Sequence, residues 1–276
     1  SNTLHTALAL ADRCEQYTLV SSISVYRDFA RAGMDEASPV ASIPEGADTD
    51  DLTDHATLGA RLASCELRLA EVCPEKAMIV RPGLLAGPFD PTERLPRLIR
   101  RVEGGGEVLA GSDADQPVQL LDVRDLAGFL LSCAAARATG LVNAVGSVTT
   151  LRELCETVAD ATHSGAECYF APDHHLARAG LEPMNHLPFW VPQAGYPGYF
   201  RVSGVRAAGM GGGERARRQQ RRCCACHQAH AHHFQTTSRD APALLPACSA
   251  ICFVSPAAPR PPPPTPPTPP ALPAPR

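Results

Sequence analysis

Two hydrophobic periods alternate along the first 206 residues of this chain. Over residues 4–14 the apolar side chains recur at helical spacing, and residues 17–21 then form a short apolar run typical of a buried strand. The same order returns over residues 57–72 and 77–81, because Pro74 ends the helical stretch before the next apolar run. The pattern predicts further helices over 94–103, 123–136 and 151–162, and further strands over 118–121 and 141–144.

Strands and helices in alternation indicate parallel β-α-β units whose helices cover both faces of a sheet. The last of these helices carries its own start signal, since Thr150 and Glu153 fit a capping box. The sequence therefore predicts an α/β fold.

The alternation stops near Val202, and the rest of the chain has no hydrophobic period. Residues 211–213 are all glycine, an Arg/Gln run and a Cys/His cluster come next, and residues 261–275 are mostly proline. We therefore divide the chain into residues 1–206, which we expect to fold, and residues 207–276, which we expect to be disordered.

Charge separates the same two regions. The formal net charge is −4, but residues 207–276 hold eight arginines and two acidic residues, a net charge of +6, which leaves −10 for residues 1–206. Lysine is almost absent, since Lys76 is the single one in 276 residues. A catalytic role for lysine is therefore restricted to one position.

The composition excludes several protein classes. A chain that is 44% hydrophobic and 20% charged is typical of globular proteins rather than collagens or coiled coils. Its longest apolar stretch, residues 126–136, is about half of the roughly 20 residues that cross a bilayer, and the first residues do not form a signal peptide. We therefore expect a cytoplasmic protein with no membrane contact. Of its eleven cysteines, we expect six to be reduced core thiols: Cys14, Cys65, Cys73, Cys133, Cys155 and Cys168.

Four short segments carry a family resemblance. They are LVSSISVY at residues 19–26, VRPGLLAGP at 80–88, DPTER at 90–94 and QLLDVRDLA at 119–127. In this order they resemble the extended short-chain dehydrogenase/reductases, the NAD-dependent epimerase/dehydratase family. The resemblance covers roughly residues 1–206.

The resemblance implies a partial Rossmann-like parallel sheet made of the family's later strands, with a small substrate lobe from residues 83–115 and 145–200. The chain corresponds to the C-terminal two-thirds of a family member, so we expect an open apolar sheet edge where earlier strands are missing. The parent activity would be NAD- or NADP-dependent epimerisation, dehydration or reduction of a small carbonyl or sugar-type substrate.

Dinucleotide binding requires a glycine-rich turn between a strand and a helix, whose N-terminus holds the pyrophosphate. The glycine clusters at residues 104–106 and 211–213 end a predicted helix and begin the tail, so neither meets this requirement. By resemblance, Arg81, Pro82 and Gly83 line the nicotinamide and the substrate, although Pro82 and Gly83 also suffice to turn the chain at a strand end. The resemblance implies NAD or NADP as the cofactor, but since neither glycine cluster can hold the pyrophosphate, we expect this chain not to bind it.

The acid–base pair of the family is also missing. Family members use a Tyr-x-x-x-Lys pair on one helix, in which the ammonium lowers the pKa of the phenol that exchanges the substrate proton. No tyrosine of this chain has a lysine four positions later, and the motif spacing places the family's tyrosine at Leu58 and its lysine at Leu62. Ser22 matches the substrate-positioning serine and is the catalytic residue that we expect to remain.

Other candidate sites have simpler explanations. Arg94 and Arg124 could clamp an anionic substrate, but neighbouring acids favour solvated surface charges. His174 and His175 point about 100° apart on a helix, so they do not chelate one ion together. The Cys/His cluster at residues 223–233 has zinc-compatible ligands without a standard spacing. We assign no metal site.

The predicted tail offers two further kinds of partner. The arginines over residues 215–222 lack interleaved aromatic side chains, so we expect no specific nucleic-acid binding. The proline run would adopt the polyproline II form that SH3 and WW grooves bind, which allows a protein partner. A reading-frame shift near residue 203 would equally explain the composition of the tail.

Two functional hypotheses result. The first is a degenerate or incomplete NAD(P)-dependent epimerase/dehydratase/reductase-like protein, inactive because the glycine-rich turn and the Tyr-x-x-x-Lys pair are missing. The alternative is a non-catalytic scaffold whose core docks one partner while the proline-rich tail recruits another.

Overall fold

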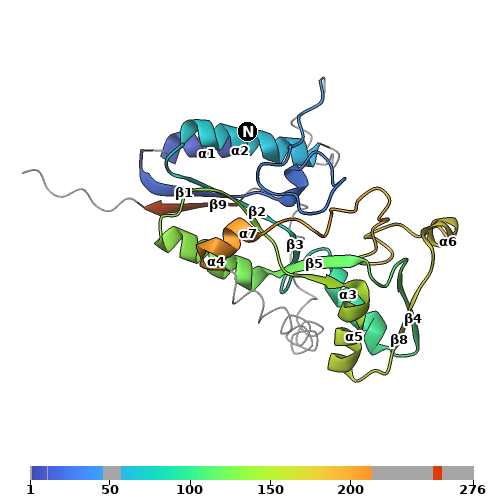
Figure 1. The fold of residues 1–276 in the computed structure, drawn as a ribbon. Coiled ribbons are helices and arrows are strands. Elements are labelled where there is room, and N and C mark those ends of the chain that lie inside the picture. Colours follow the sequence, from blue (N-terminus) through green and yellow to red (C-terminus); the bar gives the residue numbers. More distant parts are fainter. Residues whose placement is uncertain (1, 11, 46–56, 213–250, 257–276) are drawn as a thin grey trace, which may run out of the picture.

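The computed structural model describes residues 2–10, 12–45, 57–212 and 251–256, and Figure 1 shows their arrangement. An α/β core with one four-stranded sheet lies at one end, and a smaller lobe with short strands lies at the other. This architecture confirms the predicted α/β class with a partial Rossmann-like parallel sheet.

The main sheet has the strand order β6-β2-β1-β9. Its three parallel strands are β1 (Cys14–Val20), β2 (Ala77–Pro82) and β6 (Gly140–Ala144), and β9 (Ile251–Pro256) is antiparallel to β1. Helices cover both faces (Figure 1): α1 (Asn2–Leu10) and α2 (Leu58–Val72) on one side, α4 (Val123–Ala135) and α7 (Val205–Ala207) on the other. None of the helices in the described part of the chain has the length and apolar character needed to span a membrane.

The side chains of β2 show why this sheet needs two helical layers. Alternate residues of a strand point to opposite faces. Ala77 and Ile79 belong to a buried cluster with α1 and α2, whereas Met78 and Val80 belong to one with α4. Every residue of β2 is buried, as expected for a strand covered on both sides.

The small lobe contains two short sheets and three helices. One sheet joins β3 (Leu84–Ala86), β5 (Pro117–Asp122) and β7 (Val148–Thr150), and the other joins β4 (Glu107–Gly111) to β8 (Glu167–Phe170). The helices are α3 (Arg94–Glu103), α5 (Leu151–Thr162) and α6 (Asp173–Arg178). Apolar stripes of α3 and α5 form a shared core with β4 and β5, and α5 begins with the predicted capping box of Thr150 and Glu153.

The first predicted helix is too long. α1 ends at Leu10, the backbone N–H of Arg13 donates to the Leu10 carbonyl in a turn, and Cys14 already belongs to β1. Cys14 continues the apolar pattern but is buried among strand residues, because β1 pairs with its neighbours from this position onward. The periodicity also gave no sign of four strands of three to five residues, namely β3, β4, β7 and β8.

Part of the predicted disordered tail has regular backbone. Residues 205–212 form α7 and the following π-helical turn η2 (Ala208–Gly212), and β9 pairs along β1 from Val20 opposite Ile251 to Cys14 opposite Pro256. The edge of β1 that we expected to be open is therefore paired with the chain's own strand. The Cys/His cluster and the proline run lie outside the described residues.

Candidate functional site

The carboxyl ends of the parallel strands meet at one edge of the main sheet. The Ser21 amide donates to the Val80 carbonyl at 2.7 Å, and the Gly83 amide donates to the Ala144 carbonyl at 2.9 Å. Ser22 and Gly83 therefore lie just beyond β1 and β2 at the same edge. In open α/β sheets, ligands bind outside the carboxyl ends of the strands.

Ser22 directs its hydroxyl into the turn after β1. The short helix η1 (Ile23–Val25) begins there, and the Ser22 Oγ accepts from the Ser24 amide at 3.1 Å and lies 3.1 Å from the Ser24 Oγ. The side chain is half-buried. A hydroxyl has one donor and two acceptor positions, so this cap leaves Ser22 with capacity for another hydrogen bond.

α2 packs directly against this turn. A Cβ added at Gly59 would lie 2.1 Å from the carbonyl oxygen of Ser24, so only glycine allows this approach. Leu58 and Leu62 flank Gly59 in the sequence. Leu62 is buried in a cluster with Ile23 and Val25, and Leu58 packs against the same cluster. The two positions assigned to the family's acid–base pair thus lie beside the Ser22 turn and present apolar groups.

Arg81 is a buried residue near the carboxyl end of β2. Its guanidinium Nε lies 3.0 Å from Glu66 Oε1 on α2, and Nη2 lies 2.6 Å from Glu66 Oε2. The guanidinium carbon also lies 5.1 Å from the centre of the Tyr26 ring. Burial opposes the charge on Arg81, but hydrogen bonding to Glu66 and its negative charge outweigh this and raise the pKa of Arg81. The Arg81 side chain therefore ties α2 to β2.

Tyr26 continues this polar network. Its hydroxyl donates to Asn143 Oδ1 at 2.8 Å, and Asn143 Nδ2 donates to the Ser203 carbonyl at 3.1 Å. The backbone amide of Asn143 donates to Glu36 Oε1 at 2.7 Å. Burial raises the pKa of Tyr26, although hydrogen bonds with Arg81 and Asn143 lower it in part. Tyr26 is therefore neutral at physiological pH and holds the end of β6.

The predicted cofactor-lining residues occupy different environments. Arg81 and Pro82 are buried inside β2, and Gly83 is half-buried just beyond it. A Cβ added at Gly83 would lie 3.0 Å from Val145 Cγ1, so glycine keeps the β2 and β6 ends close. Sequence analysis did not single out Glu66 and Asn143, because their roles depend on partners 15 and 117 positions away.

The two arginines considered as anion clamps, Arg94 and Arg124, form hydrogen bonds to other groups of this chain. Arg124 donates to Asp122 through Nε at 2.9 Å and Nη2 at 2.5 Å, and Asp122 caps α4. Arg94 donates from Nε to the Met184 carbonyl at 3.4 Å. Burial raises the pKa of Tyr199, and the charge of Arg94 lowers it in part. Both candidate anion clamps therefore contact groups of this chain.

Metal ligands do not gather in the described part of the chain: no three His, Cys, Asp or Glu side chains there could hold an ion. The rings of His174 and His175 contact each other edge to face, with their centres 4.2 Å apart. The candidate cluster at residues 223–233 lies outside the described residues.

Comparisons with known proteins show which solved structures share this architecture. No protein-family model matches the chain, and no curated protein matches its sequence. Among solved structures, a functionally unknown conserved protein from Silicibacter pomeroyi DSS is 18% identical with a TM-score of 0.54, over 82% of this chain and 70% of that protein. A proposed epimerase from Burkholderia cenocepacia J2315 is 17% identical with a TM-score of 0.51, over 76% of this chain and 62% of that protein.

A third structure, human epimerase family protein SDR39U1 (isoform 2) with NADPH, is 19% identical with a TM-score of 0.50, over 76% of this chain and 66% of that protein. The chain thus spans about three fifths of the length of the Burkholderia protein. These similarities define the class of fold as a mixed α/β architecture with a partial Rossmann-like sheet. The fold is shared with solved structures described as a proposed epimerase and as an epimerase family protein, and it is the fold that the sequence resemblance implied.

Proposed function

We propose that this chain is a degenerate relative of the NAD(P)-dependent epimerases, dehydratases and reductases. It keeps the sheet edge at which Ser22 and Gly83 lie, but it does not catalyse proton transfer. The apolar packing of Leu62 beside the Ser22 turn carries this proposal. An acid–base pair needs a phenol and an ammonium on one helical face, and Leu58 and Leu62 supply neither. Loss of general acid–base catalysis alone lowers a rate by about 10²–10⁴-fold.

The described residues also do not fit the pyrophosphate of a dinucleotide. A phosphate-binding turn needs free backbone N–H groups at a helix N-terminus that comes directly after a strand. α4 and α5 both begin directly after strands, but the Asp122 side chain caps the first and the Thr150–Glu153 capping box closes the second. Both ends place a carboxylate where a phosphate would bind, and the charges would repel each other.

Nucleotide binding tests the cofactor part of the proposal. SDR39U1 was solved with NADPH, so NADPH is the first ligand to titrate, followed by NADH, with cofactor fluorescence as the signal. We expect no saturable change up to about millimolar nucleotide, which corresponds to less than about 4 kcal/mol of binding free energy. Saturable binding would show that the remaining core holds a cofactor and would overturn this part.

A double variant tests the catalytic part. Leu58→Tyr with Leu62→Lys restores the pair by sequence. We expect the double variant, once circular dichroism shows that it is folded, to give no NADPH oxidation with carbonyl or sugar-type substrates, because the described residues do not fit the pyrophosphate. Turnover by the double variant would contradict the proposal. If the wild-type chain binds neither nucleotide, the scaffold hypothesis becomes the next one to test.

The free energy of unfolding tests the packing of Leu62 separately. Leu62→Lys buries an ammonium in an apolar cluster, and we expect it to lower the free energy of unfolding by about 3 kcal/mol or more. Leu67 lies on the same helix with 62% of its surface exposed, so Leu67→Lys is the matched control and should change stability by less than about 0.5 kcal/mol. Equal effects would mean that position 62 is not an apolar site.

A further inference from the structure

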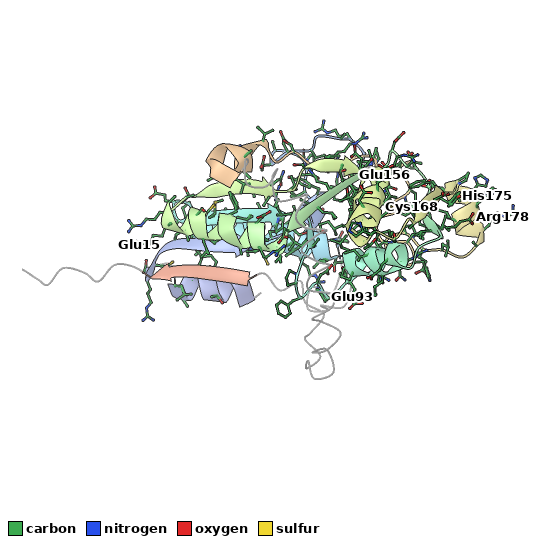
Figure 2. All side chains as sticks on the ribbon, turned by 90° about the horizontal axis from the view of Figure 1, so that it is seen from below. Glu15, Glu93, Glu156, Cys168, His175 and Arg178 are labelled. Atoms are coloured by element: carbon green, nitrogen blue, oxygen red, sulfur yellow. The ribbon has the colours of Figure 1, made fainter. Side chains whose placement is uncertain are left out.

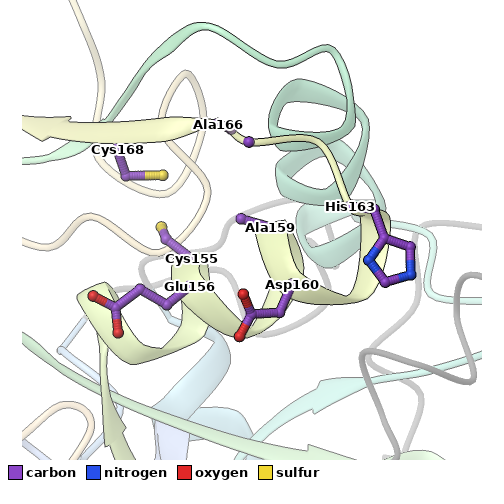
Figure 3. A pocket seen from close by; sticks show the side chains of 8 residues that line it. Cys155, Glu156, Ala159, Asp160, His163, Ala166 and Cys168 are labelled. Carbon is purple, nitrogen blue, oxygen red and sulfur yellow. The ribbon is translucent and has the colours of Figure 1, made fainter.

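The small lobe has a surface hollow of about 670 Å³ between α5 and β8 (Figure 3). Glu156, Asp160 and His163 lie along it, and the sulfur atoms of Cys155 on α5 and Cys168 on β8 face each other beside it. Figure 2 shows Glu156 and Cys168 well away from Glu15, the second residue of β1. The residues that line the hollow all belong to α5, to β8 or to the turn between them, whereas Ser22 follows β1 of the main sheet.

The two thiols are neighbours and differ in exposure. Cys155 is 1% exposed and belongs to the core of the small lobe, whereas Cys168 is half-buried on β8 and lines the hollow. Burial raises the pKa of Cys155, and the neighbouring Cys168 thiol raises it further through its charge and a hydrogen bond. Both cysteines are free. They form a reduced pair with one inner and one accessible thiol.

Two well-defined elements hold these thiols opposite each other. α5 ends at Thr162, its C-cap His163 has a φ of 51° in the left-handed region, and Gly165 with φ +61° returns the chain along the helix. Cys168 then pairs with Val108 in the parallel ladder between β4 and β8. Its position is fixed by this register and that of Cys155 by the helix, so the contact does not depend on a loop.

We propose that Cys155 and Cys168 are an oxidation site that forms a reversible disulfide in the presence of a hydroperoxide. The Cys168 thiol loses its proton and the thiolate attacks the peroxide, so that an S–O bond forms as the O–O bond breaks. The leaving oxygen takes up a proton, which gives a sulfenic acid and an alcohol, or water when the oxidant is hydrogen peroxide. The Cys155 sulfur then attacks the sulfenic sulfur, forms the S–S bond and loses its proton, and water leaves. The dithiol gives up two electrons and two protons, and the hydroperoxide is reduced to an alcohol and water.

The difference in exposure assigns these roles. The accessible Cys168 meets the oxidant first, and the buried, protonated Cys155 is a poor first nucleophile that becomes reactive when an electrophilic sulfur stands beside it. The disulfide would join α5 to β8 between residues 13 positions apart in the sequence. This cross-link restricts the unfolded chain and so stabilises the small lobe.

Peptide mapping of the full chain tests the proposal. The protein is reduced, treated with hydrogen peroxide, alkylated and digested with trypsin. No Lys or Arg lies between Arg152 and Arg178, so both cysteines fall in one peptide. We expect this peptide to be lighter by two hydrogens, to resist alkylation until dithiothreitol is added, and to stay joined after cleavage at Glu156 and Glu167. The oxidised protein should also melt at a higher temperature than the reduced protein.

Three variants make the result specific. Cys168→Ser changes a half-buried position and should abolish both the mass change and the rise in melting temperature, and Cys155→Ala should do the same. Cys65→Ser removes another half-buried cysteine and should leave both effects intact. Full alkylation of both thiols after peroxide treatment, a link from Cys168 to any other cysteine, or a rise in melting temperature that persists in Cys168→Ser would overturn the proposal.

Discussion

The Arg81 guanidinium and the Glu66 carboxylate form a bidentate ion pair inside the protein, with Nη2 2.6 Å from Oε2 and side chains only 4% and 7% exposed. The pair joins the middle of α2 to the end of β2, beside the ring of Tyr26. It therefore helps to hold the helix that carries Leu58 and Leu62 against the edge of the sheet.

Breaking this pair should be costly. Glu66→Gln leaves the buried Arg81 charge without its counterion, and removing one partner of a buried pair lowers stability by about 3–5 kcal/mol. Urea unfolding monitored by circular dichroism measures the change. The matched control is Glu71→Gln on the same helix, whose pair with Arg68 at 3.4 Å is exposed. We expect less than about 0.5 kcal/mol there, and an equally small effect at Glu66 would disprove the role of the pair.

The approach of α2 to the Ser22 turn depends on Gly59. Gly59→Ala puts a Cβ 2.1 Å from a backbone carbonyl oxygen, and the resulting displacement should lower the free energy of unfolding by about 1–3 kcal/mol. Gly128 lies on α4 with nothing within 4 Å of an added Cβ, so Gly128→Ala should instead stabilise the protein by about 0.5–1 kcal/mol. Thermal unfolding of the two variants should give shifts of opposite sign, and shifts of the same sign would refute the close approach.

The Tyr26 hydroxyl should contribute to stability through Asn143. Tyr26→Phe leaves Asn143 Oδ1 buried without this donor, which costs about 1–3 kcal/mol. Tyr169 is 46% exposed and donates to Glu167 at the surface, so Tyr169→Phe is the control and should be nearly neutral. Chemical denaturation of both variants tests this difference, and a neutral Tyr26→Phe would mean that water satisfies Asn143.

The capping box of α5 should make stability depend on pH in the acid range. The pKa of Glu153 is lowered by hydrogen bonds from the Thr149 hydroxyl and the Thr150 backbone amide. As the pH falls, the Glu153 carboxylate is protonated first in the unfolded chain, near pH 4.3, because its pKa is higher there. The stabilisation is therefore complete above that pH and is lost as the pH falls through the folded pKa. The stability difference between wild type and Glu153→Gln should therefore shrink between about pH 5 and pH 3. A difference that stays constant over this range would contradict the assignment.

The local pattern was enough to predict most of the regular elements. α2 and α3 were placed within a residue of their observed ends, because an amphipathic helix shows its buried face within every few residues of sequence. The start of α5 was equally clear, since its capping box uses residues three positions apart. Motif spacing assigned Leu58 and Leu62 to the family's tyrosine and lysine positions, and in the structure both residues pack in the cluster that contains Ile23 and Val25.

The sequence by itself thus determined the alternation of helices and strands along residues 1–206. Only the tertiary structure decided where the Arg81 side chain lies, that β9 pairs with β1, and that Cys155 faces Cys168. These contacts join residues that no short-range period relates. Their partners are set by how helices and strands pack after the chain has folded back on itself, and a strand of three to five residues acquires its identity only from the neighbour with which it pairs.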